Sequence, residues 1–280
     1  MTRGQEILQI ARKNNQNDDM LFNAYNISSS EHFDAVIIAP VWTPFKIGFP
    51  IEGITVCKST INVQSNNPDK IPMMKKSKES YIIDWNGLRL GWLITGTCAG
   101  NVIDSTLFLS DTATDRLIFL GSAGGLTPDV SVGEVTTPSC CVDCVGATQY
   151  FADFNRFTVF DSIIEANNPN YVKQITKLAD QQGISLSSRK VFCTDSILGE
   201  YLHMDRIQGV GAEIIEMETS AFYCAAKLME KSAVAFLVVS DNSSIGKSFS
   251  APYKKDFEHY NQIIRSVIPK LLQIACEIPL

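Results

Sequence analysis

Short apolar runs alternate with longer amphipathic stretches along the chain. The run at residues 34–39 ends at Pro40 and is typical of a buried strand rather than of a helix. Asn86 and Gly87 separate two such runs and predict a β-hairpin, whereas residues 62–80, rich in Asn, Ser, Lys and Pro, predict an exposed loop. The predicted strands cover residues 34–39, 81–84, 88–95, 117–120, 191–193, 213–216 and 233–239, and a further strand starts at 132–135. The predicted helices cover residues 2–11, 101–109, part of 162–182, 219–229 and 257–274.

Strands and helices thus alternate through most of the length, which indicates an α/β fold with a largely parallel sheet covered on both faces. No Gly/Ser-rich or Pro-rich linker divides the chain, so we expect one domain over residues 33–280, preceded by an N-terminal helical extension over 1–32. Ligands of such sheets gather at the carboxyl ends of strands. Three predicted turns qualify: Gly121–Gly125, Glu216–Glu218 and Ser240–Asn242.

Composition and charge narrow the functional classes. The chain has 280 residues, 45% of them hydrophobic, and carries 24 Lys and Arg against 30 Asp and Glu, a formal net charge of −6. Extended contact with nucleic acid is not expected at this charge. No apolar run approaches membrane-spanning length, and residues 1–17 lack the pattern of a secretory signal, so a cytoplasmic location is expected. The eight cysteines are interpreted as buried thiols in a reducing compartment.

Three segments match known phosphate-binding, metal-binding or dinucleotide-binding motifs only incompletely. Residues 245–248 are similar to the end of a phosphate-binding loop, but Asp241 stands where that motif requires its first Gly. Cys141 and Cys144 have metal-ligand spacing, yet no second pair completes a set of four, and no metal is expected. Gly121–Gly125 lacks dinucleotide-binding spacing; it is either a tight strand exit or a place where a polar ligand approaches the backbone closely.

Glu216 and Glu218 pose the sharpest question, because they stand directly behind an apolar run. In an extended chain both side chains project to one face. An acidic first helical turn would explain one of them. Burying both requires hydrogen-bond donors, and sugar hydroxyls are suitable donors. Asp241 has a similar ambiguity: it is either a helix N-cap or an acid whose pKa is raised by burial.

Together, three segments resemble the nucleoside phosphorylase family, which also includes the methylthioadenosine/S-adenosylhomocysteine nucleosidases. They are 119–126 with 132–135, then 215–219, then 239–241, in the family's order and spacing. The resemblance spans roughly residues 33–275. It implies a three-layer α/β/α domain with a mixed, largely parallel sheet that cleaves the N-glycosidic bond of a nucleoside.

The resemblance also implies roles for single residues. Glu218 would bind the ribose 2′- and 3′-hydroxyls, Met217 would pack on the sugar, and Glu216 would support Glu218 from behind. Asp241, beside Ser240, would protonate or hydrogen-bond N7 of a departing purine. The remaining positions on the substrate side are Ser122, Ala123 and Gly124 of the glycine-rich segment and Ile197, which replaces an aromatic residue that often stacks on the base.

The nucleophile side departs from the family pattern. Phe119 replaces the Arg that binds phosphate in phosphorylases, and Lys46 is the nearest substitute for a second Arg. Thr95, Gly96 and Thr97 match the phosphate-side loop. We therefore expect inorganic phosphate as co-substrate, with no other cofactor. Hydrolysis by water and a non-catalytic nucleoside-binding role remain the alternatives, although residues 42–46 offer no acid to activate water.

Family resemblance further implies a homo-oligomer, either a dimer or a hexamer, with sites at subunit edges. Lys75 and Lys76, in the predicted 62–80 loop, would then reach toward the site of a neighbouring subunit.

Overall fold

The computed structural model describes residues 1–280 except 16–18, 50–53, 59–77, 152–161 and 248–251. The strands are β1 Ala35–Ala39, β2 Ile54–Lys58, β3 Glu79–Trp85, β4 Leu88–Ile94, β5 Arg116–Gly125, β6 Val135–Cys144, β7 Ser162–Ile164, β8 Ser187–Thr194, β9 Ile214–Glu216 and β10 Ser232–Asn242. The α-helices are α1 Arg3–Asn15, α2 Met20–Tyr25, α3 Ala99–Leu107, α4 Gly146–Gln149, α5 Pro169–Gln181, α6 Ile197–Leu202, α7 Met204–Gly209, α8 Thr219–Leu228, α9 Lys254–Ser266 and α10 Ile268–Glu277, with short 3₁₀ helices η1 Phe108–Asp111 and η2 Ser243–Ile245.

The strands form one mixed sheet in the order β10-β6-β8-β9-β5-β1-β4-β3-β2, with β7 paired to β6. Strand β10 also pairs with β5, so β5, β9, β8, β6 and β10 close into a ring while β1, β4, β3 and β2 extend from it. Pairing is parallel between β1 and β4, β1 and β5, β5 and β10, and β6 and β8. Strands β1, β4, β5 and β10 therefore run in one direction with their carboxyl ends at one edge, whereas β6 is antiparallel to β10 and β9 is antiparallel to β5.

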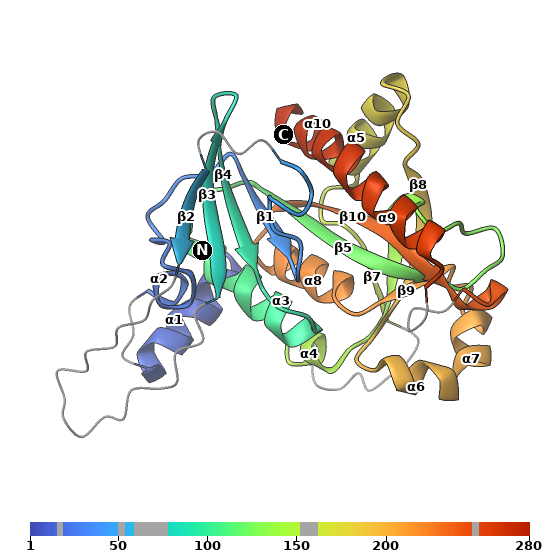
Figure 1. Cartoon of the computed structure of the whole chain (residues 1–280). Helices are drawn as coiled ribbons and strands as arrows, with labels where there is room; N and C mark the ends of the chain where they lie inside the picture. Colours follow the sequence, from blue (N-terminus) through green and yellow to red (C-terminus); the bar gives the residue numbers. More distant parts are fainter. Residues whose placement is uncertain (16–18, 50–53, 59–77, 152–161, 248–251) are drawn as a thin grey trace.

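Alternation along the strands divides the interior into two apolar layers. In β1, Val36 and Ile38 belong to a core shared with α3 and α8, whereas Ala35, Ile37 and Ala39 belong to a core shared with α5, α9 and α10. Figure 1 shows these helix groups on opposite faces of the sheet. The sequence-based prediction of a three-layer α/β/α domain is confirmed.

Two of the three predicted turns are strand ends instead. Strand β5 continues through the glycines to Gly125, and β10 continues through Ser240 and Asp241 to Asn242. The two strands remain paired to their ends, with Asp241 opposite Gly124 and Asn242 opposite Gly125. The prediction was wrong here because backbone pairing, rather than side-chain hydropathy, sets where these strands end.

Other boundaries also differ from the sequence prediction. Strand β6 starts only at Val135, since the amide of buried Asn242 donates to the carbonyls of Thr127 and Val130 and holds the preceding segment as a loop. The 162–182 stretch begins as β7, and its helix starts at Pro169. The expected terminal helix is two helices, α9 and α10.

The hairpin prediction is confirmed, because Asn86 and Gly87 join β3 to β4 with φ values of 50° and 80°. Strand β3 begins at Glu79, so the end of the expected 62–80 loop is strand, and β2 was not predicted at all. Lys75 and Lys76 lie outside the described residues.

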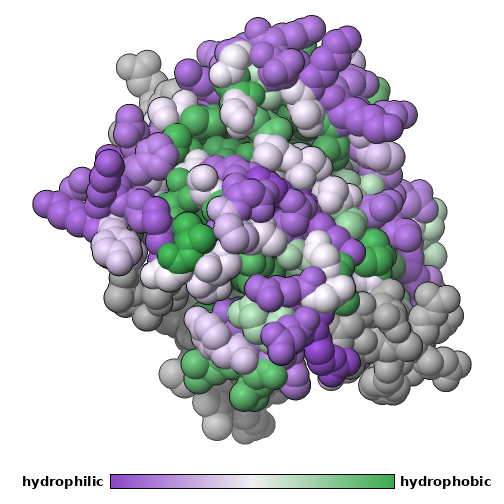
Figure 2. All heavy atoms as spheres, turned by 90° about the vertical axis from the view of Figure 1, so that its right-hand side faces the viewer, coloured by the Kyte–Doolittle hydropathy of each residue, from purple (hydrophilic) through white to green (hydrophobic). Residues whose placement is uncertain are grey.

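The surface is mostly polar, with one apolar concentration on a short helix. Helix α6 exposes four large apolar side chains: Ile197, Leu198, Tyr201 and Leu202. Figure 2 views the side of the molecule on which α6 and α7 lie in Figure 1, and its lower part shows apolar patches between polar ones. Among the described residues, no helix is both long and apolar enough to cross a membrane.

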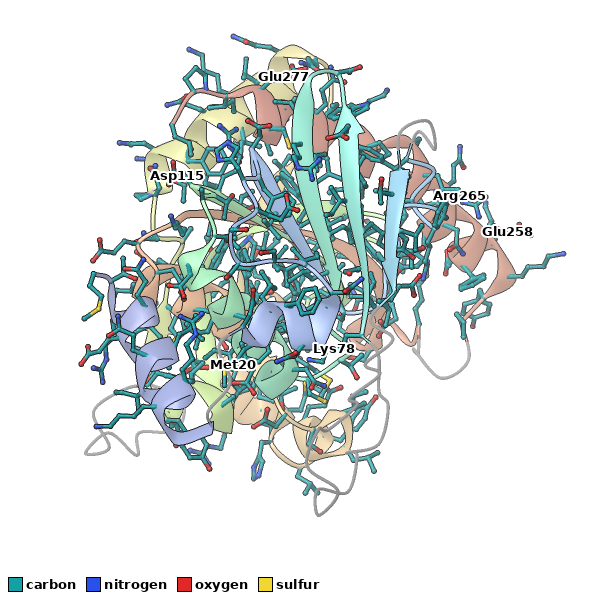
Figure 3. The ribbon with its side chains drawn as sticks, turned by 90° about the vertical axis from the view of Figure 1, so that its left-hand side faces the viewer. Met20, Lys78, Asp115, Glu258, Arg265 and Glu277 are labelled. Carbon is teal, nitrogen blue, oxygen red and sulfur yellow. The ribbon has the colours of Figure 1, made fainter. Side chains whose placement is uncertain are left out.

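The edge of the sheet is tied to the N-terminal helices by a polar contact. The Lys78 ammonium donates to the Ser105 hydroxyl at 3.0 Å and lies over the Tyr25 ring, 5.6 Å from its centroid. Figure 3 shows Lys78 beside α2, on the opposite side of the sheet from Arg265 of α9. Lys78 directly precedes β3, whose first residues pair with the end of β4, Ser80 lying opposite Leu93.

Candidate active site

Three neighbouring strand ends bring the predicted acids together. In the sheet, Gly124 of β5 lies between Asp241 of β10 and Ile215 of β9. A side chain at Gly124 would place its Cβ 3.2 Å from Asp241 Oδ2 and 3.4 Å from Ile215 Cγ2. Because neighbouring strands are about 4.8 Å apart, the segment after Ile215 begins about 10 Å from Asp241 across this glycine. That separation suits a small ligand held between Asp241 and Glu218, which lies in the segment after Ile215.

The turn after β9 is organised by the carboxylate of Glu216. Its Oε2 accepts the backbone N–H groups of Glu218 and Thr219, both at 2.8 Å, and its Oε1 accepts the Cys193 thiol at 2.7 Å. These bonds place the negative charge at the N-terminus of α8, where the helix dipole favours it. Both oxygens of Glu216 are occupied by protein donors, whereas Met217 is half-buried beside it.

Glu218 reaches across to the loop that follows β4. Its Oε1 accepts the backbone N–H of Cys98 at 2.7 Å. Cys98 adopts φ 80°, a backbone conformation that is strained for any residue with a Cβ, and its side chain is exposed. The contact joins the sugar-side and phosphate-side predictions, because Thr97 immediately precedes Cys98.

The phosphate-side loop is shaped by backbone bonds. The Thr95 and Gly96 amides donate to the carbonyls of Ala39 and Pro40, and Gly96 has φ 79°. Thr95 is buried, with its hydroxyl donating to the Gly96 carbonyl, whereas Thr97 is exposed. Thr97 therefore presents its hydroxyl to solvent, whereas the Thr95 hydroxyl is bonded to a backbone carbonyl; among the described residues no such bond is made by the Thr97 hydroxyl.

Burial raises the pKa of both glutamates. The pKa of Glu218 rises to about 7, first because the carboxyl group is buried and second because Glu216 is close. Burial also raises the pKa of Glu216, while its thiol and amide donors act in the opposite direction. Glu218 therefore titrates near neutral pH, and a carboxyl pKa raised in this way is typical of functional sites.

Asp241 is held beside the glycine-rich strand end. The Ser240 hydroxyl donates to Asp241 Oδ1 at 2.6 Å and lies 3.3 Å from the Ala123 carbonyl. Burial raises the pKa of Asp241. Glu200 of α6 faces the same acid: its pKa rises to about 7, through burial and then through the charge of Asp241.

Helix α6 brings Ile197 to the same end of the sheet. Glu200 stands three residues after Ile197, so the two side chains share one helix face. Ile197 is exposed. The charge interaction between Glu200 and Asp241 therefore brings the helix that carries Ile197 toward the end of β10.

A second polar contact joins the glycine-rich strand to α9. The Ser122 hydroxyl and Tyr260 hydroxyl are 2.6 Å apart, and the Tyr260 ring packs edge-on to Trp42 at 6.5 Å. Trp42 begins the loop that carries Lys46, whose side chain is exposed. Lys46 thus lies on a loop packed against this contact, but no hydrogen bond or ion pair of the described residues joins it to Thr95, Gly96 or Thr97.

Phe119 is part of the interior. It is fully buried, its ring lies 5.4 Å from that of Phe222, and its Cε1 would be 2.8 Å from a Cβ at Gly121. Phe119, which stands where the family resemblance implied a phosphate-binding Arg, therefore contributes packing to the core. A guanidinium could not replace this ring without disturbing the core around Phe222.

Four residues near the predicted site escaped the sequence prediction: Cys98, Cys193, Glu200 and Tyr260. Helical spacing from Ile197 was an available signal for Glu200. For Cys98, the available signal was its position directly after Thr97. Nothing in the sequence connects Cys193 or Tyr260 to their partners, because those contacts join segments far apart along the chain.

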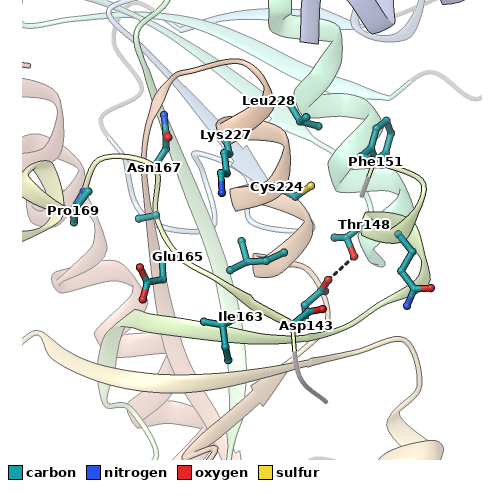
Figure 4. A pocket seen from close by; sticks show the side chains of 14 residues that line it. Asp143, Thr148, Phe151, Ile163, Glu165, Asn167, Pro169, Cys224, Lys227 and Leu228 are labelled. Carbon is teal, nitrogen blue, oxygen red and sulfur yellow. Dashed lines mark hydrogen bonds between the residues drawn. The ribbon is translucent and has the colours of Figure 1, made fainter. Parts of the chain in front are cut away.

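One cavity lies apart from these residues. It has a volume of about 870 Å³ and opens between β6, β7, α4 and α8, with Asp143, Thr148, Cys224 and Lys227 among its lining residues (Figure 4). None of the predicted site residues lines it. The candidate active site is placed at the strand ends that carry Glu216, Glu218 and Asp241 rather than in this cavity, because these acids are the groups that the predicted reaction requires.

No metal cluster was found in the part of the chain that the structure describes: no three His, Cys, Asp or Glu side chains converge on a possible ion position. Cys141, half of the predicted Cys-x-x-Cys pair, is buried in the apolar layer facing α8.

The fold and the strand-end acids define an α/β protein with a polar site at the carboxyl ends of its sheet. The model of the phosphorylase superfamily matches residues 63–274, and the chain belongs to that superfamily. It is 28% identical over 137 residues to a DeoD-type purine nucleoside phosphorylase of Anoxybacillus flavithermus, covering 48% of this chain and 55% of the relative. The chain thus matches about half the length of this curated relative.

Solved structures share the fold over nearly the whole chain. Uridine phosphorylase from Vibrio fischeri ES114 superposes with a TM-score of 0.70 at 16% identity, covering 90% of this chain and 95% of that one. The 5′-methylthioadenosine/S-adenosyl homocysteine nucleosidase of Campylobacter jejuni superposes with a TM-score of 0.64 at 12% identity, covering 88% and 99%. At these identities the likeness extends to the fold alone.

Proposed function

We propose that this protein cleaves the N-glycosidic bond of a purine nucleoside and transfers the pentosyl group to inorganic phosphate. The observation that carries the proposal is the pairing of Asp241, Gly124 and Ile215 on adjacent strand ends, with Glu218 bound to the Cys98 amide. Gly124 has no side chain and so lets the Asp241 carboxylate lie close to β5, since a Cβ there would be 3.2 Å from Asp241 Oδ2. Membership of the phosphorylase superfamily supports the reaction class.

In the proposed reaction, the bond between C1′ and the base nitrogen breaks and the sugar becomes oxocarbenium-like. The electron pair goes to the departing purine. Asp241, whose pKa is raised by burial, donates a proton or a hydrogen bond to N7 and so stabilises the leaving base. Glu218 binds the 2′- and 3′-hydroxyls, and Met217 packs on the sugar. A phosphate oxygen then attacks C1′ and gives the pentose 1-phosphate.

The proposal favours purine over pyrimidine because Asp241 would act on N7, an atom that pyrimidines lack. The partial relative is named a purine nucleoside phosphorylase, which agrees with this choice. Ile197 and Glu200 on α6 would contact the base, and Ser122, Ala123 and Gly124 would line its other side. Thr97 and Lys46 would bind phosphate as the co-substrate, and no further cofactor is required.

Hydrolysis is the second candidate, and Phe119 favours it. Because this ring is packed into the core, the guanidinium that holds phosphate in related phosphorylases has no counterpart at this position. Water would then attack C1′ and free pentose would form.

Product analysis tests both candidates. Adenosine, inosine, guanosine and methylthioadenosine are each incubated with the protein, with and without phosphate. Base release only with phosphate, giving pentose 1-phosphate, supports the phosphorylase. Free pentose in both conditions supports hydrolysis. Saturable nucleoside binding without release over hours would contradict both and favour a non-catalytic binding protein.

Replacing Asp241 tests the proposed acid. Asp241→Asn keeps the size of the side chain but cannot donate the carboxylic proton, so kcat/KM should fall by about 10²–10⁴-fold. The matched control is Asp115→Asn, since Asp115 is exposed and pairs only with Lys231 at the other end of the sheet. Unchanged turnover in Asp241→Asn would rule out the assigned role.

We also propose that the protein forms a dimer or a hexamer. The exposed apolar residues of α6 support this, because apolar side chains that lie together on a surface are typical of interfaces. Light scattering after size-exclusion chromatography tests it: a single 30.9 kDa species across the accessible concentration range would contradict the proposal.

A further inference from the structure

A buried thiol contacts the acid pair from behind. Cys193 of β8 is fully buried and lies opposite Glu216 in the parallel pairing of β8 with β9. Its Sγ donates to Glu216 Oε1 at 2.7 Å. A buried cysteine usually serves as a small apolar side chain, but this one meets a carboxylate that needs a donor because it has left water.

The contact fixes which way the Glu216 carboxylate faces. With Oε1 turned toward Cys193, Oε2 is turned toward the turn that follows β9, where it accepts the amides of Glu218 and Thr219. Those two amides begin helix α8, whose first residue is Thr219. The orientation of this carboxylate therefore determines the backbone of the residue that is proposed to hold the sugar.

Glu218 is fixed at its other end as well, since its side chain accepts the Cys98 amide from the loop before α3. Four elements thus act on Glu218: β8 through Cys193, β9 through Glu216, α8 through its first turn, and the loop before α3. If the Glu216 carboxylate rotates, the backbone N–H groups of Glu218 and Thr219 lose their acceptor, and the Glu218 side chain is no longer directed at one position.

We propose that Cys193 is a positioning residue that orients Glu218 toward the sugar hydroxyls by holding the Glu216 carboxylate. This inference rests on the proposed function for the sugar-binding role of Glu218. It assigns the thiol no part in bond breaking. Its consequence is substrate selection: a well-oriented Glu218 favours a ribonucleoside over its 2′-deoxy counterpart, because the deoxy substrate leaves a buried carboxylate oxygen unpaired.

Three substitutions separate hydrogen bonding from packing. Cys193→Ser keeps a donor, Cys193→Val fills the space without one, and Cys193→Ala removes both. Cys276→Ala is the control, because Cys276 is also a buried thiol but lies in α10 beside the other apolar layer. Thermal unfolding establishes that each variant is folded before it is assayed.

The first readout is the ratio of kcat/KM for adenosine to that for 2′-deoxyadenosine, or the corresponding ratio for whichever purine ribonucleoside is turned over. We expect the ratio to fall about tenfold in Cys193→Val and Cys193→Ala, the loss corresponding to one hydrogen bond to a charged group. Cys193→Ser and Cys276→Ala should keep the wild-type ratio. An unchanged ratio in a folded Cys193→Val protein would overturn the proposal, since loss of packing alone lowers both substrates together.

The second readout does not depend on turnover. Amide hydrogen exchange over the peptide that contains Glu218 and Thr219 should be faster in Cys193→Val than in wild type and unchanged in Cys193→Ser. Equal exchange in all variants overturns the positioning role even if the enzyme is active. Faster exchange in a protein that cleaves no nucleoside supports the positioning role while refuting the proposed function, so the two failures are distinguishable.

Discussion

At the scale of single residues, the site is built from acids whose charge is opposed by burial. The charge of Glu216 is stabilised by three donors, whereas Glu218 has one amide donor and a charged neighbour, Glu216. The pKa of Glu218 is accordingly raised to about 7. In the ligand-free protein this acid costs stability when it ionises, because the folded state holds its proton more tightly than the unfolded chain does.

This difference predicts how stability depends on pH. The contribution of protonated Glu218 is fully present below about pH 4.5, the unfolded value, and is lost as pH rises through about 7. Glu218→Gln imitates the protonated form of Glu218, so the variant should keep this contribution to stability at every pH. The free energy of unfolding of wild type relative to Glu218→Gln should therefore fall by about 1–3 kcal/mol between pH 5 and 8. Urea denaturation across this range measures it.

Glu258→Gln is the control for the removal of a carboxyl charge, because Glu258 is exposed on α9. Its difference from wild type should vary little with pH. Parallel stability profiles for wild type and Glu218→Gln would show that Glu218 does not hold the additional proton in the folded state.

At the scale of elements, the site depends on how closely β10, β5 and β9 approach. Gly124 is the point of contact, since a Cβ there would stand 3.2 Å from Asp241 Oδ2. That distance is shorter than ordinary van der Waals contact, so the carboxylate would have to shift by a few tenths of an ångström. Small displacements of a catalytic group lower the rate strongly.

Gly124→Ala should accordingly lower kcat/KM about tenfold while the protein stays folded. The control is Gly209→Ala on α7, where an added Cβ meets no atom within 4 Å. Steady-state kinetics and thermal unfolding of both variants measure the effect. Full activity in Gly124→Ala would mean that Asp241 tolerates the displacement or is not the acid.

At the scale of the whole molecule, the site joins segments that only the closed ring of strands brings together. A nucleoside bound there would contact β5, β10, the turn after β9 and the loop after β4. Binding to the folded state alone stabilises it by mass action. The effect reports on the complete site rather than on any one residue.

A purine ribonucleoside at about 100 times its dissociation constant should raise the free energy of unfolding by about 2.7 kcal/mol. The 2′,3′-dideoxynucleoside at the same concentration should protect much less, because it offers Glu218 no hydroxyl. Thermal unfolding with each ligand, under conditions without turnover, measures this. Equal protection by both ligands would argue against a sugar-binding role for Glu218.

The fold was largely predictable because its determinants are local. The apolar run at 34–39 lies in β1, the Asn86-Gly87 turn forms its hairpin, and alternating strands and helices give the three layers. Strand β2 was missed because it lies at the sheet edge, where burial does not require an apolar run. The ends of β5 and β10 were missed because Gly124 and Asp241 stay in the sheet through backbone pairing, with Ser240 unpaired where the register shifts.

By itself the sequence determined which residue types are available at the strand ends: the acids Glu216, Glu218 and Asp241, and the glycine between them. It also determined the two hydropathy periods that form the layers. Only the tertiary structure decided that the Glu216 oxygens accept hydrogen bonds from protein donors and that Glu218 accepts the Cys98 amide. It also decided that Phe119 packs in the core rather than lying exposed. These outcomes depend on contacts between residues far apart in the chain, and hydropathy patterns carry no information about which distant side chains meet.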